Sequence, residues 1–430
     1  MGVKVLSLFD GMACGMIAFK QLSIEVDEYH AYEIDKYTIQ VSKHNFPDII
    51  HHGDVFEGNF TEYRNFDYLI GGSPCTYWSI AQSADRRETA ASGIGWELFS
   101  QYVRALHEAK PKYFLYENNK SMSNEIYKSI SETFGFEPIM INSALVSAQN
   151  RQRYYWVGKR NLDGSYGKVD IEQPEDRGIL LRDVINGITD REKGRAVIGS
   201  TGRTTHREYF KKSQGNMVYE PVKELSEREM DYMMRETKPT FNGRWNYCQK
   251  PGQDKKSKCL VANVSKEVPY NVVAEPVNII QSPNRCFTLP RLDGEQTQSK
   301  QYRVYDIYGK STTLCAEGGG MGAKTGLYAI PVEFENGVPI KAISEVDGKT
   351  YTVYRVIKGR INIKGKEYPI KLIDGFYIIR KLTINECKKL QTVPEWFEFP
   401  VSDTQAYKCL GNGWTVEVIV HLLRNTLEVL

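Results

Sequence analysis

A single cysteine, Cys75, stands at the end of the turn GGSPC (71–75), directly after a short apolar run at 66–70. The run is typical of a buried strand, and two glycines allow the chain to turn sharply where the strand ends. A thiol presented in such a loop can act as a nucleophile. A cysteine near a strand end is more often a small buried hydrophobe, so Cys75 alone predicts no reaction.

Chemically useful side chains also follow the other predicted strands. Asp10, Glu33, Asp54 and Glu117 each stand near a strand end, as Cys75 does. The carboxyl ends of parallel strands open on one edge of a sheet, so we expect these side chains to lie close together. One such acid is more often a helix cap or a solvated turn, but a whole series is hard to explain in that way.

The acids also indicate a kind of cofactor. Glu33 could accept hydrogen bonds from ribose hydroxyls, and Asp54 could accept one from an exocyclic amine. Neither GxGxxG nor a Walker pattern follows the first predicted strand. A nucleoside cofactor without phosphates is therefore favoured over a nicotinamide dinucleotide or a nucleoside triphosphate.

Strands and helices alternate through the first 160 residues. We predict strands at 3–9, 29–34, 49–51, 66–70 and 113–116, and helices at 16–22, 37–46 and 95–109. This order predicts an α/β fold with a doubly wound, largely parallel, Rossmann-like sheet. The final run, 416–430, is predicted to be a helix that returns to this domain.

The composition is ordinary for a soluble globular protein. The 430 residues are 41% hydrophobic and 25% charged, with a net charge of +3. No apolar run is long enough to predict a membrane span. The eight cysteines form no CxxC pair, which argues against a zinc site and a disulfide framework and favours a reducing cytoplasm. The small net charge neither requires nor excludes a nucleic-acid partner.

Six motifs, in order, resemble those of the cytosine-5 DNA methyltransferases of bacteria and phages. They are LFDGMACG (8–15), GGSPC (71–75), YEN (116–118), QNRQR (149–153), RKLT with the residues that follow (380–394) and GNGWTV (411–416). The first departs from the common bacterial pattern at Ser7 and Ala13, and Asn119 replaces a usual valine. The ordered set is far more specific than any single motif.

The resemblance implies methyl transfer from S-adenosyl-L-methionine to carbon 5 of a flipped-out cytosine in a specific double-stranded DNA sequence. Cys75 would attack carbon 6, Glu117 would hold or supply a proton at nitrogen 3, and Arg153 with Arg151 would bind the oxygen at carbon 2. Taken alone, the two arginines indicate only a solvated strand face. The implied cofactor contacts are Phe9, Gly11, Glu33, Asp54, Pro74, Leu98, Asn412 and Trp414. No metal is expected.

The resemblance also divides the chain. Residues 1–185 would form the catalytic and cofactor-binding domain, 186–378 a smaller β-rich target-recognition domain, and 379–430 a segment returning to the first domain. The loop 76–95 could close over a flipped base. In the middle region basic and aromatic residues interleave, which suits a nucleic-acid surface, although an ordinary soluble β-rich surface would show the same pattern. The examples are Arg207 with Tyr209, Arg244 with Trp245, Arg303 with Tyr305, and the lysines 255, 256 and 258.

Other functions remain open at this point. An RNA cytosine-5 methyltransferase of the tRNA-modifying kind is one, because 286–288 (CFT) resembles a tripeptide found there, although the large middle region favours DNA. A catalytically silent DNA-binding regulator is disfavoured by the intact Cys75, Glu117 and Arg153. A nicotinamide-dependent oxidoreductase would require GxGxxG. We expect a monomer acting on DNA in the cytoplasm of a bacterial or phage-infected cell, with or without a companion restriction enzyme.

Overall fold

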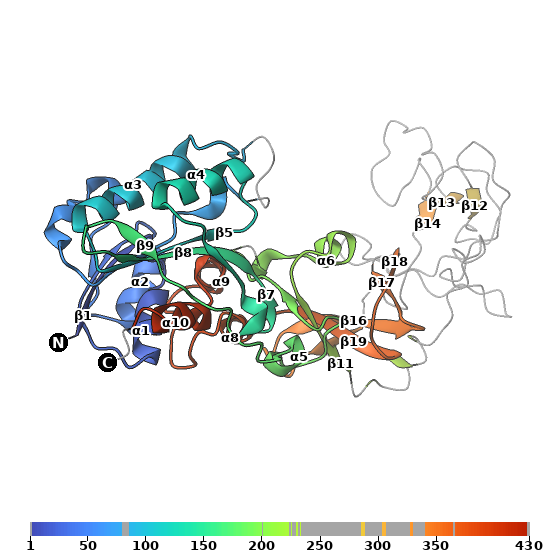
Figure 1. The fold of residues 1–430 in the computed structure, drawn as a ribbon. Coiled ribbons are helices and arrows are strands. Elements are labelled where there is room, and N and C mark those ends of the chain that lie inside the picture. Colours follow the sequence, from blue (N-terminus) through green and yellow to red (C-terminus); the bar gives the residue numbers. More distant parts are fainter. Residues whose placement is uncertain are drawn as a thin grey trace. The chain divides into compact units, whose positions relative to one another are not determined.

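The structure, a computed structural model, describes residues 2–79, 86–199, 201–222, 340–363 and 366–427, with a few short stretches between 223 and 339. The chain divides into two compact units (Figure 1). One comprises Met1–Lys223 and Ala342–Leu430, and the other comprises Glu224–Lys341. The boundaries predicted for the recognition domain, 186 and 378, stay a prediction.

The first unit is built on an eight-stranded sheet of order β3-β2-β1-β4-β5-β8-β6, with β9 paired to β8. Only β8 runs against the others, so the doubly wound, largely parallel α/β sheet is confirmed. The strands are β1 (Val3–Leu8), β2 (Val26–Tyr32), β3 (Ile50–His51), β4 (Tyr68–Gly71), β5 (Tyr113–Asn119), β6 (Ile139–Asn142), β8 (Gln152–Arg160) and β9 (Tyr166–Lys168).

Helices cover both faces of this sheet (Figure 1). One face carries α1 (Cys14–Gln21), α2 (Lys36–Asn45) and α10 (Val416–Arg424), and the other carries α3 (Ile94–Ala109) and α4 (Asn124–Phe134). Residues of β1 alternate between two apolar clusters, Val5 in one and Leu6 and Leu8 in the other. A strand buried on both faces explains why its sequence is continuously apolar.

Two predicted strand ends are wrong. β5 continues to Asn119, so Glu117 lies inside a strand and not after it. The extension occurs because β8 pairs with β5 as far as Asn119, opposite Arg153. β2 ends at Tyr32, so Glu33 follows the strand and does not close it.

The predicted helices at 16–22, 37–46, 95–109 and 416–430 correspond to α1, α2, α3 and α10, although residues 428–430 lie outside the described part.

A second, antiparallel sheet in the first unit has the order β11-β19-β16-β17-β18, with β15 paired to β16. β17 and β18 form an antiparallel hairpin in which Ile363 pairs with Lys366, and its tip, 364–365, lies outside the described residues. The strands are β11 (Met217–Pro221), β15 (Lys341–Ile343), β16 (Thr350–Ile357), β17 (Arg360–Ile363), β18 (Lys366–Pro369) and β19 (Gly375–Lys381).

A buried arginine joins this sheet to α8 (Ile384–Leu390). The side chain of Arg380, in β19, is fully buried. Its Nη1 and Nη2 donate to the two carboxylate oxygens of Glu386 at 2.8 and 2.9 Å, and its Nε donates to Glu220 in β11. Charges buried in this way are tolerated only when they are paired and hydrogen-bonded.

Shorter elements complete the described chain. In the first unit they are η1 (Val55–Glu57), η2 (Phe60–Tyr63), η3 (Cys75–Tyr77), η4 (Ser143–Leu145), β7 (Gln149–Asn150), α5 (Leu181–Val184), β10 (Gly194–Arg195), η5 (Thr201–Arg203), α6 (His206–Lys212) and α9 (Asp403–Asn412). The second unit contains a three-stranded sheet of β12 (Arg285–Thr288), β13 (Arg303–Asp306) and β14 (Leu327–Ala329). The basic and aromatic residues singled out at 244–245 and 255–258 lie outside the described residues.

None of the described helices has the length and apolar character that a membrane crossing needs.

Candidate active site

Glu117 lies where four separate segments meet. Its Oε1 is 3.0 Å from Nε of Arg153 on β8, and its Oε2 accepts a hydrogen bond of 3.0 Å from the indole Nε1 of Trp414. Both the Arg153 and the Glu117 side chains are largely buried, at 16% and 12% exposure. A Cβ on Gly72 would lie only 2.8 Å from Glu117 Oε2. Glycine at 72 therefore lets the turn that leads to Cys75 approach the carboxylate.

The backbone of Cys75 begins η3, immediately after the exposed Pro74. The exit from this turn is anchored, because Trp78 is fully buried and its indole Nε1 donates to Glu88 Oε2 at 3.2 Å. The same carboxylate accepts the backbone N–H of Gly95, in the first turn of α3. Residues 80–85 lie outside the described part, so loop closure over a base stays a prediction.

Arg151 and Arg153 have different partners. Arg151 is buried at 4% exposure, and its guanidinium donates to the carbonyls of Val197 and Gly413 at 2.9 Å each. It also reaches the carbonyl of Gly411. The solvated strand face is therefore wrong for Arg151. Its guanidinium supports the turn that carries Asn412 and Trp414, whereas Arg153 is paired with Glu117.

The backbone of the turn between β1 and α1 is strained. Phe9, Gly11 and Ala13 all have left-handed backbone angles, with φ of 57°, 62° and 62°. Non-glycine residues rarely adopt this conformation outside tightly held turns. The N–H of Gly11 donates to Glu33 Oε2 at 2.9 Å. Two of the predicted cofactor contacts are thus joined directly.

The other predicted cofactor residues have mixed local roles. Asp54 accepts the N–H of Phe56 at 3.0 Å as the cap of η1, so the local explanation for this acid is correct. Asn412 is exposed at the end of α9, and Leu98 is partly exposed in α3. Ile34, directly after Glu33, is an apolar residue with 74% exposure, and the sequence analysis did not name it as a candidate site residue. Its place directly after an acid at a strand end could have suggested it.

Comparison with known proteins identifies the family. Residues 3–428 match the model of the C-5 cytosine-specific DNA methylases. The chain belongs to this family. An orphan methyltransferase of Bacillus phage rho11s is 27% identical over 389 residues, which cover 83% of this chain and 68% of that protein. An orphan methyltransferase of Bacillus phage SPbeta is 23% identical and covers 99% of this chain and 98% of its own length. A type II methyltransferase of Lactococcus lactis subsp. cremoris is 29% identical over 44% of this chain and 49% of that protein.

In this DNA cytosine-5 methyltransferase, some residues of the family motifs form buried hydrogen bonds that connect distant segments of the chain. Gln149, the first residue of QNRQR, is fully buried. Its amide nitrogen donates to Gln391 Oε1 at 2.8 Å, and its amide oxygen accepts the N–H of Val197 at 3.0 Å. Gln391 donates in turn to the carbonyls of Leu410 and Gly413. These buried amides hold the C-terminal turn against the catalytic sheet.

Asp10 is a further residue that the sequence analysis assigned no role in the site. It is 9% exposed, and its Oδ1 accepts hydrogen bonds of 2.6 Å from both Ser7 and Tyr29. Its Oδ2 is buried and has no hydrogen-bond partner in the described structure. Burial raises the pKa of this carboxyl from its usual 3.8 to about 7. Between about pH 4 and pH 7, the folded methyltransferase therefore keeps a proton on Asp10 that the unfolded chain loses.

We expect Asp10→Asn to remove a pH-dependent loss of stability. As the pH rises from about 4 to about 7, Asp10 ionises in the unfolded chain but stays protonated in the folded protein, so the free energy of unfolding falls. Above pH 7, Asp10 ionises in both states and the free energy of unfolding falls no further for this reason. Each pKa unit corresponds to about 1.4 kcal/mol, so the effect is on the order of 2–4 kcal/mol. Calorimetric melting at pH 5, 6, 7 and 8 should show an increasing advantage of the variant.

The matched control is Asp163→Asn. A hydrogen bond from Ser165 lowers the pKa of the exposed Asp163, so this variant should lose a little stability at neutral pH. Equal pH dependence in the wild type and in Asp10→Asn would contradict the assignment.

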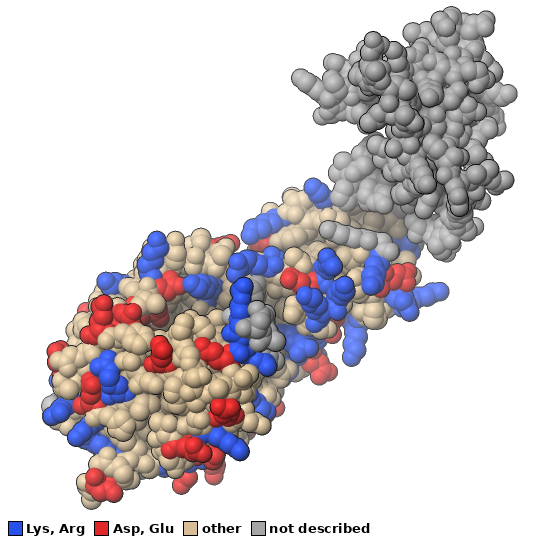
Figure 2. Space-filling view, turned by 90° about the horizontal axis from the view of Figure 1, so that it is seen from above, with Lys and Arg blue, Asp and Glu red and all other residues tan. Residues whose placement is uncertain are grey.

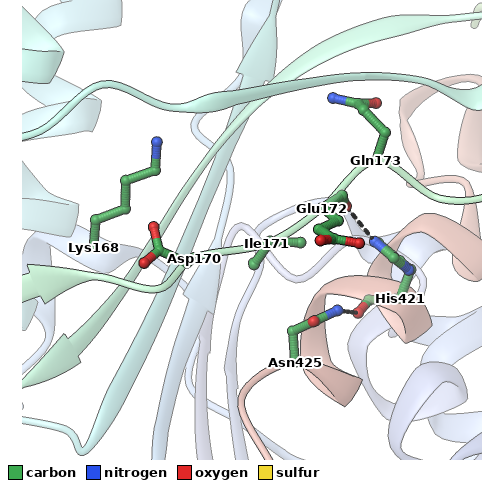
Figure 3. Close-up of a pocket in the computed structure, with 7 residues that line it drawn as sticks. All are labelled: Lys168, Asp170, Ile171, Glu172, Gln173, His421 and Asn425. Carbon is green, nitrogen blue, oxygen red and sulfur yellow. Dashed lines mark hydrogen bonds between the residues drawn. The ribbon is translucent and has the colours of Figure 1, made fainter.

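A polar cavity of about 530 Å³ lies elsewhere in the first unit (Figure 3). His421, on α10, contacts the carbonyl of Glu172 across it at 2.8 Å. The lining residues are Lys168, Asp170, Ile171, Glu172, Gln173, His421 and Asn425. None of the predicted catalytic or cofactor residues is among them.

Proposed function

We propose that this methyltransferase transfers the methyl group of S-adenosyl-L-methionine to carbon 5 of a flipped-out cytosine in a specific double-stranded DNA sequence, through a covalent adduct between Cys75 and carbon 6. The observation that carries the proposal is the cluster around Glu117. Arg153 and Trp414 fix both carboxylate oxygens, and Gly72 brings the turn that leads to Cys75 against them.

The chemistry explains why these residue types are needed. Carbon 5 of cytosine is a poor nucleophile, and addition of the Cys75 thiolate to carbon 6 makes the ring an enamine. Glu117 holds a proton at nitrogen 3 and Arg153 binds the oxygen at carbon 2, so negative charge does not build up on the ring. After carbon 5 accepts the methyl group it loses its proton, and elimination of Cys75 releases 5-methylcytosine. Arg151 acts here by holding the C-terminal turn.

We propose that the cofactor binds at the edge of the sheet where the turn between β1 and α1 lies. S-adenosyl-L-methionine supplies an electrophilic methyl group when bound. We propose that Phe9, Gly11, Glu33, Asp54, Pro74, Leu98 and Asn412 hold it. Support comes from the Gly11–Glu33 hydrogen bond and from the exposed Ile34. No phosphate-binding pattern follows β1, as suits a nucleoside cofactor without phosphates.

Charge on the first unit supports DNA as the substrate (Figure 2). Lys and Arg side chains gather over the part that carries the antiparallel sheet. Exposed basic residues of this sheet, its connecting loops and α6 include Lys211, Lys212, Lys358, Arg360, Lys366 and Lys371. Such a surface attracts the phosphate backbone. We propose that residues 186–378 recognise the target sequence and that the protein acts as a monomer in a bacterial cytoplasm. The phage and bacterial methyltransferases to which the chain is similar support action in a bacterial cell.

Bisulfite sequencing tests the proposal. In a host that lacks its own cytosine-5 methylation, cells expressing the wild type should show conversion-resistant cytosines within one short sequence. Glu117→Gln should lower the methylated fraction at limiting expression, because removing a group that handles a proton typically costs 10²–10⁴-fold in rate. Complete conversion of the DNA with protected cytosines in RNA would favour an RNA methyltransferase. Complete conversion of both, with cofactor still bound, would favour a silent DNA-binding protein.

A further inference from the structure

The only polar atom of the Trp414 side chain, the indole Nε1, donates a hydrogen bond to Glu117. The two residues are 297 positions apart in the chain, yet the indole Nε1 lies 3.0 Å from Glu117 Oε2. An indole has one N–H donor and no acceptor. Since Arg153 occupies the other carboxylate oxygen, each oxygen of Glu117 has its own donor.

The backbone that carries this indole is fixed independently of Glu117. On its N-terminal side, the Gly413 carbonyl accepts from Arg151 at 2.9 Å and from Gln391 at 3.2 Å. On its C-terminal side, the hydroxyl of Thr415 is bonded to Ser143 and Gln391, at 2.9 Å each. The backbone on both sides of Trp414 is therefore held by buried contacts that do not involve Glu117, so the indole can orient the carboxylate.

We propose that Trp414 is a positioning residue for Glu117, and that through it the C-terminal segment sets the orientation of the carboxylate that binds the target cytosine. This differs from a role of Trp414 as a cofactor contact, which the family resemblance implies. The inference rests on the proposed function in one respect, namely that Glu117 acts on the base. A hydrogen bond to an ionised group is stronger than one between neutral groups, and it also fixes direction.

Trp414→Phe tests the inference, since it keeps an aromatic ring and removes the donor. We expect kcat at saturating DNA and cofactor to fall about 10- to 100-fold, as one lost hydrogen bond to a charged group would cause. The dissociation constant of S-adenosylhomocysteine, measured by calorimetry, should change less than about twofold. Substitution of 3-benzothienylalanine at position 414 replaces only the N–H and should give the same loss if Trp414→Phe fails to fold. Trp396→Phe, at an exposed tryptophan, is the matched control and should leave both quantities unchanged.

A double-mutant cycle separates this inference from the proposed function. In single-turnover assays, adding Trp414→Phe to Glu117→Ala should cause no further loss, because the indole acts through the carboxylate. Wild-type activity of Glu117→Ala would overturn the role of Glu117 itself. If Glu117→Ala is impaired and the two losses multiply, or if Trp414→Phe weakens S-adenosylhomocysteine binding tenfold with kcat intact, the positioning role is wrong.

Discussion

Cys75→Ala should abolish methyl transfer, by more than about 10³-fold, while cofactor binding persists. The covalent route needs a thiolate, and a methyl side chain cannot add to carbon 6. The three buried cysteines of the described structure cannot substitute. Burial raises the pKa of the Cys14 thiol to about 12 and that of Cys409 to about 11, and it raises the pKa of Cys387 as well. At neutral pH these remain thiols, which are poor nucleophiles.

Transfer of a labelled methyl group to DNA measures the loss, and calorimetry with S-adenosylhomocysteine measures retained binding. DNA carrying 5-fluorocytosine at the target gives a second test, because fluorine at carbon 5 cannot leave as a proton and the adduct persists. The wild type should form a complex with this DNA that survives denaturation, and Cys75→Ala should not. Normal turnover by Cys75→Ala would sink the covalent mechanism.

Arg380→Met should cause the largest loss of stability. The substitution leaves the carboxylates of Glu220 and Glu386 buried without their cation. Breaking a buried pair in this way costs about 3–5 kcal/mol. Urea unfolding, followed by fluorescence and circular dichroism together, should show a lower midpoint for the variant.

Two further variants control this experiment. Arg360→Met removes an exposed arginine, 63% exposed and 3.5 Å from Glu367, and should cost less than about 1 kcal/mol. Combining Arg380→Met with Glu220→Gln and Glu386→Gln removes the stranded charges and should recover part of the loss. Equal destabilisation by Arg360→Met and Arg380→Met would show that burial of the ion pair does not matter.

The sheet could be predicted because each central strand is a local apolar run, buried on both faces. The extent of β5 could not, because it depends on pairing with β8, whose residues lie some forty positions further along the chain. The same limit applies to the site. Sequence order predicted that Glu33 and the turn at Gly11 meet, since parallel strands end at one edge.

The different roles of Arg151 and Arg153 could not be predicted from two arginines that lie two positions apart in one motif. The partners of Arg151 are carbonyls 46, 260 and 262 residues away. The contact between Trp414 and Glu117 also joins distant positions. Identifying Cys75 as the nucleophile depended on the resemblance, since local physical chemistry favours a buried hydrophobe.

Because α10 packs on α1, the first helix of the fold must wait during synthesis for a helix made much later. The thiol of Cys14 contacts the carbonyl of Trp414, 400 residues later. A ribosome adding about 5–20 residues per second needs roughly 20–80 s to travel between them. During that interval Ile17 and Phe19 of α1, fully buried in the finished fold, lack the helix that covers them. Helix α1 therefore cannot complete its apolar contacts until α10 has been synthesised.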